Sequence, residues 1–382
     1  MEIVNYVLLA FAAIAAIDRI FGSKLGLGAD FEKGLSMAGP LILSMGGMLV
    51  LYPVIANWLS GIAGASSVYF DLSIIPALLL ANDMGASQLC MALSANDGVG
   101  LLNGMVVSSM MGATVSFLIP YVLQLTSKDR HNDAIFGLLC GIITIPVGVA
   151  IAGVLIGVDF IPLVFVLLPL LAFAGLLAFG IVKFEKITVK IFIYIGWFIK
   201  AVITVGLMIG IVDFVVFSAR GVRLFPETTP LWSATAATDV MQPITTILCV
   251  MVGALPLLRI LEKILSKPLK LLGKKLGTNE SSTLGMFVTL GTSITTFEMT
   301  SKMDRRGLIF NSAFAVSASF VFIDHLAWTM SIAPETTLAV VVGKISAGVA
   351  AVAFACFMCK IRGIKKERTD GAVDDAVLEA TV

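Results

Sequence analysis

Two stretches of this chain, IIPALLLANDMGASQLCMAL (residues 74–93) and SSTLGMFVTLGTSITTF (residues 281–297), decide its fold class. Each begins and ends with apolar residues, and each carries polar side chains and glycine in its middle. Backbone that leaves a helix inside a membrane must be buried in protein or line a cavity, because lipid cannot satisfy its hydrogen bonds. In a membrane protein, both stretches are therefore expected to be re-entrant or broken helical hairpins.

The composition places the chain in a lipid bilayer. Of its 382 residues, 58% are apolar and only 13% are charged, whereas soluble domains average roughly 45–50% and about 25%. The formal net charge is only +1, which argues against a nucleic-acid binder because such proteins need a basic excess. The sequence therefore predicts an all-α polytopic membrane protein.

Nine stretches are long enough to cross a membrane, which takes about 20 apolar residues for a hydrocarbon core about 30 Å thick. They are residues 3–20, 35–58, 100–125, 134–158, 161–182, 191–218, 236–258, 308–332 and 337–359. We therefore expect about nine transmembrane helices in addition to the two interrupted hairpins.

The basic residues predict an orientation if both interrupted stretches return to the side on which they start. Of the 26 Lys and Arg residues, 22 then fall on one side and only Arg220 and Arg223 on the other, while Lys200 and Lys344 lie within spans. Cytoplasmic loops carry the excess of basic residues. The N-terminus is therefore expected outside and residues 361–382 are expected to form a disordered cytoplasmic tail. Two full spans in place of the two hairpins are the alternative.

The order of the elements repeats upside down, which predicts one transmembrane domain over residues 1–360. Repeat one covers residues 31–158, linking helices cover 159–219, and repeat two covers 236–359. An offset of 208 residues pairs Asn103 with Asn311, Ser109 with Ser317, and Ser116 with Asp324. The element order is the evidence, and these identities alone are not. Inverted repeats with paired discontinuous helices are typical of secondary transporters. An unrelated bundle with two kinked helices is the alternative.

Asp83 is the first candidate binding residue, because an ionisable group within a span costs about 2.5–3.5 kcal/mol on insertion scales. It lies at the polar centre of residues 74–93, next to Asn82. An interrupted helix there would turn both side chains toward a cavity, where they could bind a substrate or an ion. The structural alternative is an ion pair of Asp83 with Lys200 or Lys344.

A second candidate set lies in the expected span 308–332. On a continuous helix Ser317, Asp324 and Trp328 would share one stripe, because residues seven and eleven apart lie on nearly the same face. A hydroxyl, a carboxylate and an aromatic ring together suit a cationic ligand. His325 follows Asp324 and belongs to the same candidate site. The alternative is an Asp324–Lys344 ion pair that joins two helices.

Neither a metal nor a cofactor is expected. Cys356 and Cys359 have the spacing of half a metal site, but no second pair exists, and His131 and His325 are far apart in sequence. No Walker A motif indicates ATP-driven pumping. An intramembrane enzyme is therefore only the third hypothesis, after two kinds of transporter.

Over nearly the whole membrane region, the sequence resembles the ethanolamine permeases that bacteria encode with their ethanolamine-utilisation genes. The resemblance is densest at residues 83–85, 109–112, 141–148, 303–304, 306–307, 311, 313–318, 324–326 and 342–344. It implies a multi-pass permease of the bacterial cytoplasmic membrane with ethanolamine as its substrate, and it is compatible with a homo-oligomer. The pattern of this family has no acid that matches Glu298, which we leave out of the site.

The implied substrate fits the candidate residues. Protonated ethanolamine carries an ammonium group and a hydroxyl, so it needs a carboxylate and a hydrogen-bonding partner. Asp83, Asp324, Asn82 and Ser317 supply these groups. We therefore expect uptake of the protonated amine by uniport. The alternatives are an ion-coupled carrier of another small polar or cationic solute and, less favoured, the enzyme.

Overall fold

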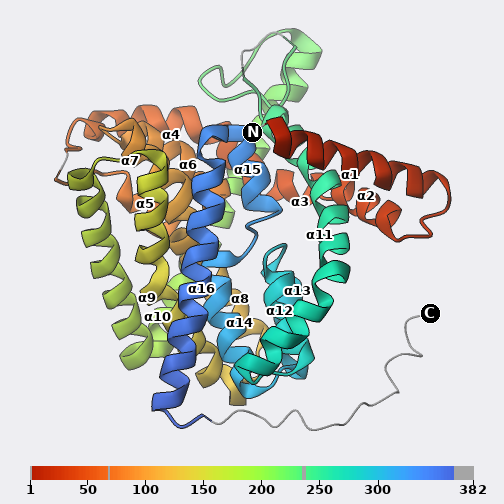
Figure 1. Cartoon of the computed structure of the whole chain (residues 1–382). Coiled ribbons are helices and arrows are strands. Elements are labelled where there is room, and N and C mark those ends of the chain that lie inside the picture. The colour runs from red at the N-terminus through yellow and green to blue at the C-terminus, as the bar shows by residue number, and fades with distance from the viewer. Residues whose placement is uncertain (1, 68, 235–237, 365–382) are drawn as a thin grey trace.

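The computed structural model describes residues 2–67, 69–234 and 238–364, and these form helices and connecting loops without a strand (Figure 1). Most of the expected tail, from residue 365 on, lies outside the described residues. In chain order the helices are α1 (Glu2–Ile20), α2 (Leu27–Ser36), α3 (Ala38–Leu41), η1 (Ile42–Gly46), α4 (Gly47–Ala63), α5 (Ile74–Leu79), η2 (Asn82–Met84), α6 (Ala86–Leu93), α7 (Asp97–Leu101), η3 (Leu102–Gly112), η4 (Thr114–Leu118), α8 (Ile119–Leu125), η5 (Lys128–Arg130), α9 (His131–Ile156), α10 (Phe160–Arg220), α11 (Met241–Leu276), α12 (Glu280–Thr289), α13 (Ser293–Glu298), η6 (Thr300–Lys302), α14 (Arg305–Ala318), α15 (Asp324–Ile332), η7 (Pro334–Thr336) and α16 (Thr337–Ile361).

Seven helical segments of the described chain are long and apolar enough to cross a membrane, which confirms the all-helical membrane class. They are Leu27–Leu59, Asp97–Leu125, Lys128–Ile156, Phe160–Phe184, Lys186–Arg220, Met241–Leu265 and Pro334–Ile361. Each coincides with an expected span. Residues 3–20 are helical as expected, but α1 is not among the seven, and part of its first turn lies outside the described side chains.

The prediction of one continuous helix over residues 308–332 was wrong. The chain leaves the helix after Ala318 and resumes it at Asp324, and Phe320 between them has a left-handed φ of 62°. Backbone hydrogen bonds from Phe320 N to the Thr289 carbonyl (3.2 Å) and from Phe322 N to the Leu290 carbonyl (2.9 Å) replace those that the break removes. Ser317 and Asp324 therefore do not share one helical stripe.

Residues 74–93 form a pair of short helices whose two ends meet. The Asp71 carboxylate, just before α5, accepts hydrogen bonds from the Ser94 hydroxyl (2.8 Å) and the Ala95 amide (3.0 Å), which follow α6. With six and eight residues, α5 and α6 rise about 9 and 12 Å. Neither helix is long enough to cross a bilayer.

Residues 280–298 form a second pair of short helices, α12 and α13, whose ends also meet. The Asp304 carboxylate accepts hydrogen bonds from the Asn279 amide (2.9 Å) and the Ser282 hydroxyl (2.6 Å). Asn279 in turn donates from its side chain to the Lys302 carbonyl (2.8 Å). The chain thus leaves this hairpin beside the point at which it entered.

A similar hydrogen bond occurs in each half of the chain, donated by asparagines 208 positions apart. Asn103 donates from Nδ2 to the Ser73 hydroxyl (2.8 Å), near the start of the first hairpin. Asn311 donates from Nδ2 to the Ser282 carbonyl (2.7 Å), near the start of the second. Both asparagines are fully buried. Each hairpin is therefore held at its base by the helix that follows it.

Glycine allows the helices behind the hairpins to pack closely. A Cβ atom added at Gly148 of α9 would collide with the carbonyl oxygen of Gly343 in α16. Small residues at such crossings are the usual means by which membrane helices approach one another, because lipid supplies no hydrophobic force between helices. The α9–α16 crossing thus fixes the position of the helix that carries Lys344.

We expect Gly148→Leu to destabilise the protein by about 1–3 kcal/mol or more, because the larger side chain forces α9 and α16 apart. A lower midpoint of thermal unfolding in detergent would show this effect. Gly175→Leu is the matched control, since no described atom lies within 4 Å of a Cβ atom added at Gly175. Equal midpoints for the two variants would contradict the close crossing.

Candidate functional site

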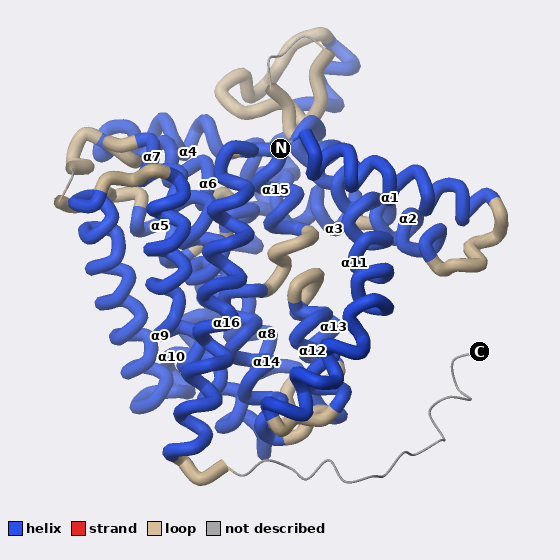
Figure 2. Tube along the Cα trace, viewed as in Figure 1, coloured by secondary structure: helices blue, strands red, loops and turns tan. Residues whose placement is uncertain are grey.

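Interrupted helices meet in the middle of the bundle. Figure 2 shows two loops near mid-height, the turn between α12 and α13 and the segment between α14 and α15, which the hydrogen bonds from Phe320 and Phe322 join. The break between α5 and α6 contacts α15 directly. The sequence opens this break with extended backbone at Leu80 and ends it with Gly85 at φ 97°, a conformation that favours glycine.

Asn82 and Asp83 lie in the break of the first hairpin, as expected. Asn82 is fully buried, and neither atom of its side-chain amide has a hydrogen-bond partner among the described residues. Asp83 remains partly exposed. The expected alternative of an ion pair with Lys200 or Lys344 is not found within 4.0 Å in the described part of the chain. Asp83 thus carries an unpaired carboxyl group.

Lys344 is fully buried, and its ammonium group donates to the carbonyl oxygen of Ser109 at 2.7 Å. Ser109 lies in η3, a π-helical segment. Lys344 is an electrostatic neighbour of Asp83 without being its ion-pair partner. Its position leaves the Asp83 carboxylate available to another cation.

Asp324 begins α15 at the end of the α14–α15 break, and Asp83 is the charged group that acts on it electrostatically. The Asp324 Oδ1 atom is buried without a hydrogen-bond partner in the described chain. The alternative Asp324–Lys344 ion pair is likewise not found within 4.0 Å among the described residues. Two neighbouring carboxyl groups without a basic ion-pair partner favour the binding of a cation beside them.

Trp328 lies against the first hairpin through a hydrogen bond that the sequence analysis missed. Its indole Nε1 donates to the Ser87 hydroxyl (3.1 Å), which in turn lies 2.7 Å from the Asn82 carbonyl oxygen. Trp328 and Ser87 are both fully buried. The signal in the sequence that could have indicated Ser87 was its position one helical turn after Asp83. This hydrogen bond joins the Asp83 break to the helix that carries Asp324.

The remaining two candidates, Ser317 and His325, flank the α14–α15 break. Ser317 is fully buried on α14, and its hydroxyl has no partner among the described residues. The His325 ring packs on Phe320, with 5.5 Å between ring centroids, and its buried Nδ1 atom has no partner in the described part of the chain. The structure thus brings Asn82, Asp83 and the α15 residues together, with Ser317 on the other side of the break.

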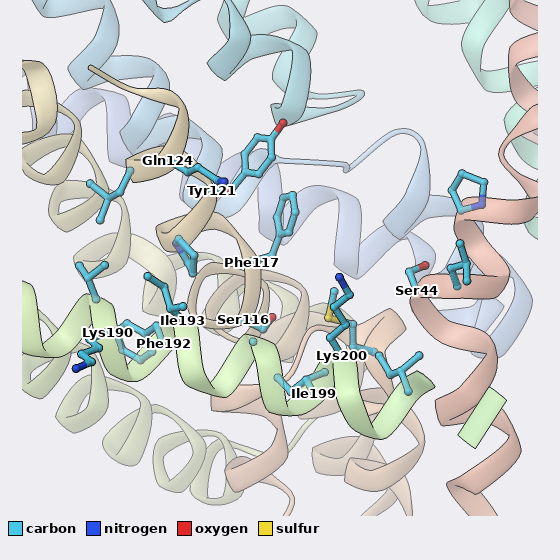
Figure 3. A pocket seen from close by; sticks show the side chains of 18 of the residues that line it. Ser44, Ser116, Phe117, Tyr121, Gln124, Lys190, Phe192, Ile193, Ile199 and Lys200 are labelled. Carbon is cyan, nitrogen blue, oxygen red and sulfur yellow. The ribbon is translucent and has the colours of Figure 1, made fainter. Parts of the chain in front are cut away.

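A cavity of about 1070 Å³ adjoins this cluster through Met84, which follows Asp83 and lines it. Figure 3 shows its walls, with Ser44 on one side, Ser116, Phe117 and Tyr121 on another, and Lys200 from α10. The sequence analysis did not predict this cavity, although the position of Lys200 within a span was a signal. A cavity of this volume can accommodate a small molecule.

No group of three or more His, Cys, Asp or Glu side chains in the described chain is placed to hold a metal ion. The five cysteines are free thiols.

Comparison with known proteins identifies the family. The family model described as "Ethanolamine utilisation protein, EutH" matches residues 1–358. The "Probable ethanolamine permease EutH" of Listeria monocytogenes is 38% identical and covers 96% of each chain. The proteins of the same name from Salmonella typhimurium and Escherichia coli are 34% and 33% identical, covering 94% of this chain and 95% of their own. No solved structure matches. These matches confirm the resemblance seen in the sequence.

We expect Ser87→Ala to weaken uptake of the substrate, because it removes the hydroxyl that joins Trp328 to the Asn82 backbone. The loss of one buried hydrogen bond, about 1 kcal/mol, corresponds to a roughly fivefold higher half-saturating concentration. Transport assays on the purified, reconstituted variant measure this value. Ser36→Ala is the control, since the Ser36 hydroxyl is exposed and donates to the Lys33 carbonyl within its own helix. A wild-type value for Ser87→Ala would remove Ser87 from the site.

Proposed function

Because the chain belongs to the EutH family, we propose that it is a membrane permease that takes up ethanolamine. The names of its relatives favour a transporter over an intramembrane enzyme. The observation that carries the proposal is the neighbouring pair Asp83 and Asp324, which lie at two helix breaks with no basic group within ion-pair distance among the described residues. A primary ammonium group matches that pair.

In the proposed binding mode, the Asp83 and Asp324 carboxylates neutralise the ammonium group. The substrate hydroxyl needs one donor or acceptor, and the Asn82 amide and the Ser317 hydroxyl both lack partners in the described chain. Trp328 supplies an aromatic face near the cation, an arrangement worth about 0.5–2 kcal/mol. The His325 Nδ1 atom is a further group that lacks a hydrogen-bond partner among the residues that the structure describes.

The proposed architecture is an inverted repeat with two re-entrant hairpins, within a single domain over residues 1–360. The hydrogen bonds that close each hairpin at its base, made by Asp71 and by Asp304, support the re-entrant arrangement. The matched contacts of Asn103 and Asn311 support the repeat. The N-terminus and the end of α16 lie at opposite ends of the bundle (Figure 1), which fits an outer N-terminus and a cytoplasmic C-terminus in the bacterial cell membrane.

We further propose that ethanolamine crosses as its cation by uniport. An inside-negative potential favours a monovalent cation by about 2.3 kcal/mol per 100 mV, and about 1.4 kcal/mol corresponds to a tenfold ratio. A uniporter could therefore accumulate the substrate roughly 40-fold at 100 mV without a coupling ion. An ion-coupled carrier of another small polar solute is the rival function.

Uptake of labelled ethanolamine into proteoliposomes should rise when a potassium diffusion potential is made inside-negative, because the potential drives the cation inward. It should need neither a sodium nor a proton gradient. Uptake that ignores voltage and follows the free-base concentration as the pH is raised would refute cation uniport. A requirement for sodium or protons would favour the ion-coupled rival.

Asp83→Asn should abolish ethanolamine uptake, because the amide cannot replace the charge that neutralises the ammonium group. The amount of protein in the membrane should stay unchanged, since Asp83 makes no ion pair in the described structure. Asp97→Asn removes an exposed carboxylate at the base of the same hairpin and should transport normally. Normal uptake by Asp83→Asn would reassign Asp83 to packing.

A further inference from the structure

The cavity beside Met84 follows one face of α10. The α10 residues that line it recur every three or four positions from Lys186 to Ile203, a stretch that rises about 25 Å. Lys186 and Lys190 follow the kink of α10 at Phe184, which the basic residues place on the cytoplasmic side, and Met84, the residue after Asp83, also lines the cavity. The cavity thus runs from the neighbour of Asp83 in the chain toward the side that is expected to be cytoplasmic.

The charged side chains that line this cavity are all basic. They are Lys186, Lys190 and Lys200, and no Asp or Glu side chain of the described chain lines it. The binding site is acidic by contrast, because two carboxyl groups, Asp83 and Asp324, lie there with one buried ammonium group, that of Lys344. A cation that moves from the site to the cytoplasm therefore passes from a negative to a positive environment.

Lys200 lies within the membrane-spanning segment Lys186–Arg220, and its side chain is exposed. Figure 3 shows its amine directed into the cavity, between Phe117 and Ser44. It has no ion-pair partner among the described residues. A lysine within a span is costly, and such residues usually have a role in transport. The charge of Lys200 acts on whatever occupies the cavity.

We propose that Lys200 lowers the affinity of the cytoplasm-facing cavity for the substrate cation and keeps cytoplasmic cations out of the binding site. The inference rests on the proposed uptake of protonated ethanolamine. Repulsion by the fixed ammonium group speeds release into the cytoplasm and slows rebinding. It leaves the final accumulation ratio unchanged, because the membrane potential alone sets the equilibrium of a uniporter.

The test is carried out on right-side-out membrane vesicles that contain the full chain. Vesicles are loaded with labelled ethanolamine, and the internal concentration that gives half-maximal efflux is measured, together with influx and the final accumulation ratio. Lys200→Gln should lower the internal half-saturating concentration about threefold or more. Lys200→Arg should behave like the wild type, and Lys33→Gln, which removes an exposed lysine of α2, is the charge-matched control.

A second measurement tests the charge itself if Lys200→Gln fails to reach the membrane. Lys200→Cys, made in a chain whose native cysteines are serines, is treated with a methanethiosulfonate that adds either an aminoethyl or a neutral methyl group. The aminoethyl group should restore the wild-type internal half-saturating concentration, and the methyl group should not.

Three outcomes separate this inference from the proposed function. The first is voltage-driven uptake by Lys200→Gln with the wild-type internal half-saturating concentration, or the same wild-type value in both modified forms of Lys200→Cys. This result would overturn the role of Lys200 and leave the permease proposal intact. A changed accumulation ratio in Lys200→Gln would also overturn it, because a release residue cannot move the equilibrium. Absence of ethanolamine transport by the wild type would overturn both proposals.

Discussion

The structure depends on one constraint, that lipid offers no hydrogen bonds to backbone which leaves a helix. The helix break at residues 319–323 meets this constraint by bonding to the second hairpin, through Phe320 and Phe322. The first hairpin is packed just as tightly at its break, since a Cβ atom at Gly112 would collide with the Leu80 carbonyl. Because interrupted backbone must be enclosed by protein, the breaks gather in the interior of the bundle and bring Asp83 close to Asp324.

The positions of the two lysines explain why none of the three alternative ion pairs forms among the described residues. The buried ammonium group of Lys344 donates to the Ser109 carbonyl in π-helical η3, and Lys200 lines the cavity beside Met84. The two acids thus share the interior without a basic partner within 4.0 Å in the described chain. In the proposed transport cycle, a substrate cation provides the missing charge and then leaves along a basic cavity.

The sequence predicted the helical class, seven of the candidate spans and the helix interruptions within residues 74–93 and 281–297, because apolar length and polar residues within apolar stretches report directly on a lipid environment. It did not predict the break after Ala318. Residues 319–323 are mostly apolar and contain neither glycine nor proline, and the left-handed Phe320 is held by contacts with residues some 30 positions away. The Trp328–Ser87 hydrogen bond, which joins residues 241 positions apart, was hidden for the same reason. Local pattern reports the environment of a segment, whereas these contacts depend on tertiary structure.

The most direct test of the account is the sidedness of the two hairpins in intact cells. In a background without native cysteines, Ser67→Cys and Asp97→Cys flank the first hairpin, and Lys274→Cys and Lys302→Cys flank the second. The account predicts that an impermeant maleimide added outside labels both members of the first pair and neither member of the second, which react only after the cells are opened. Labelling of the two members of either pair from opposite sides would contradict the re-entrant hairpins and, with them, the proposed meeting of both breaks at the binding site.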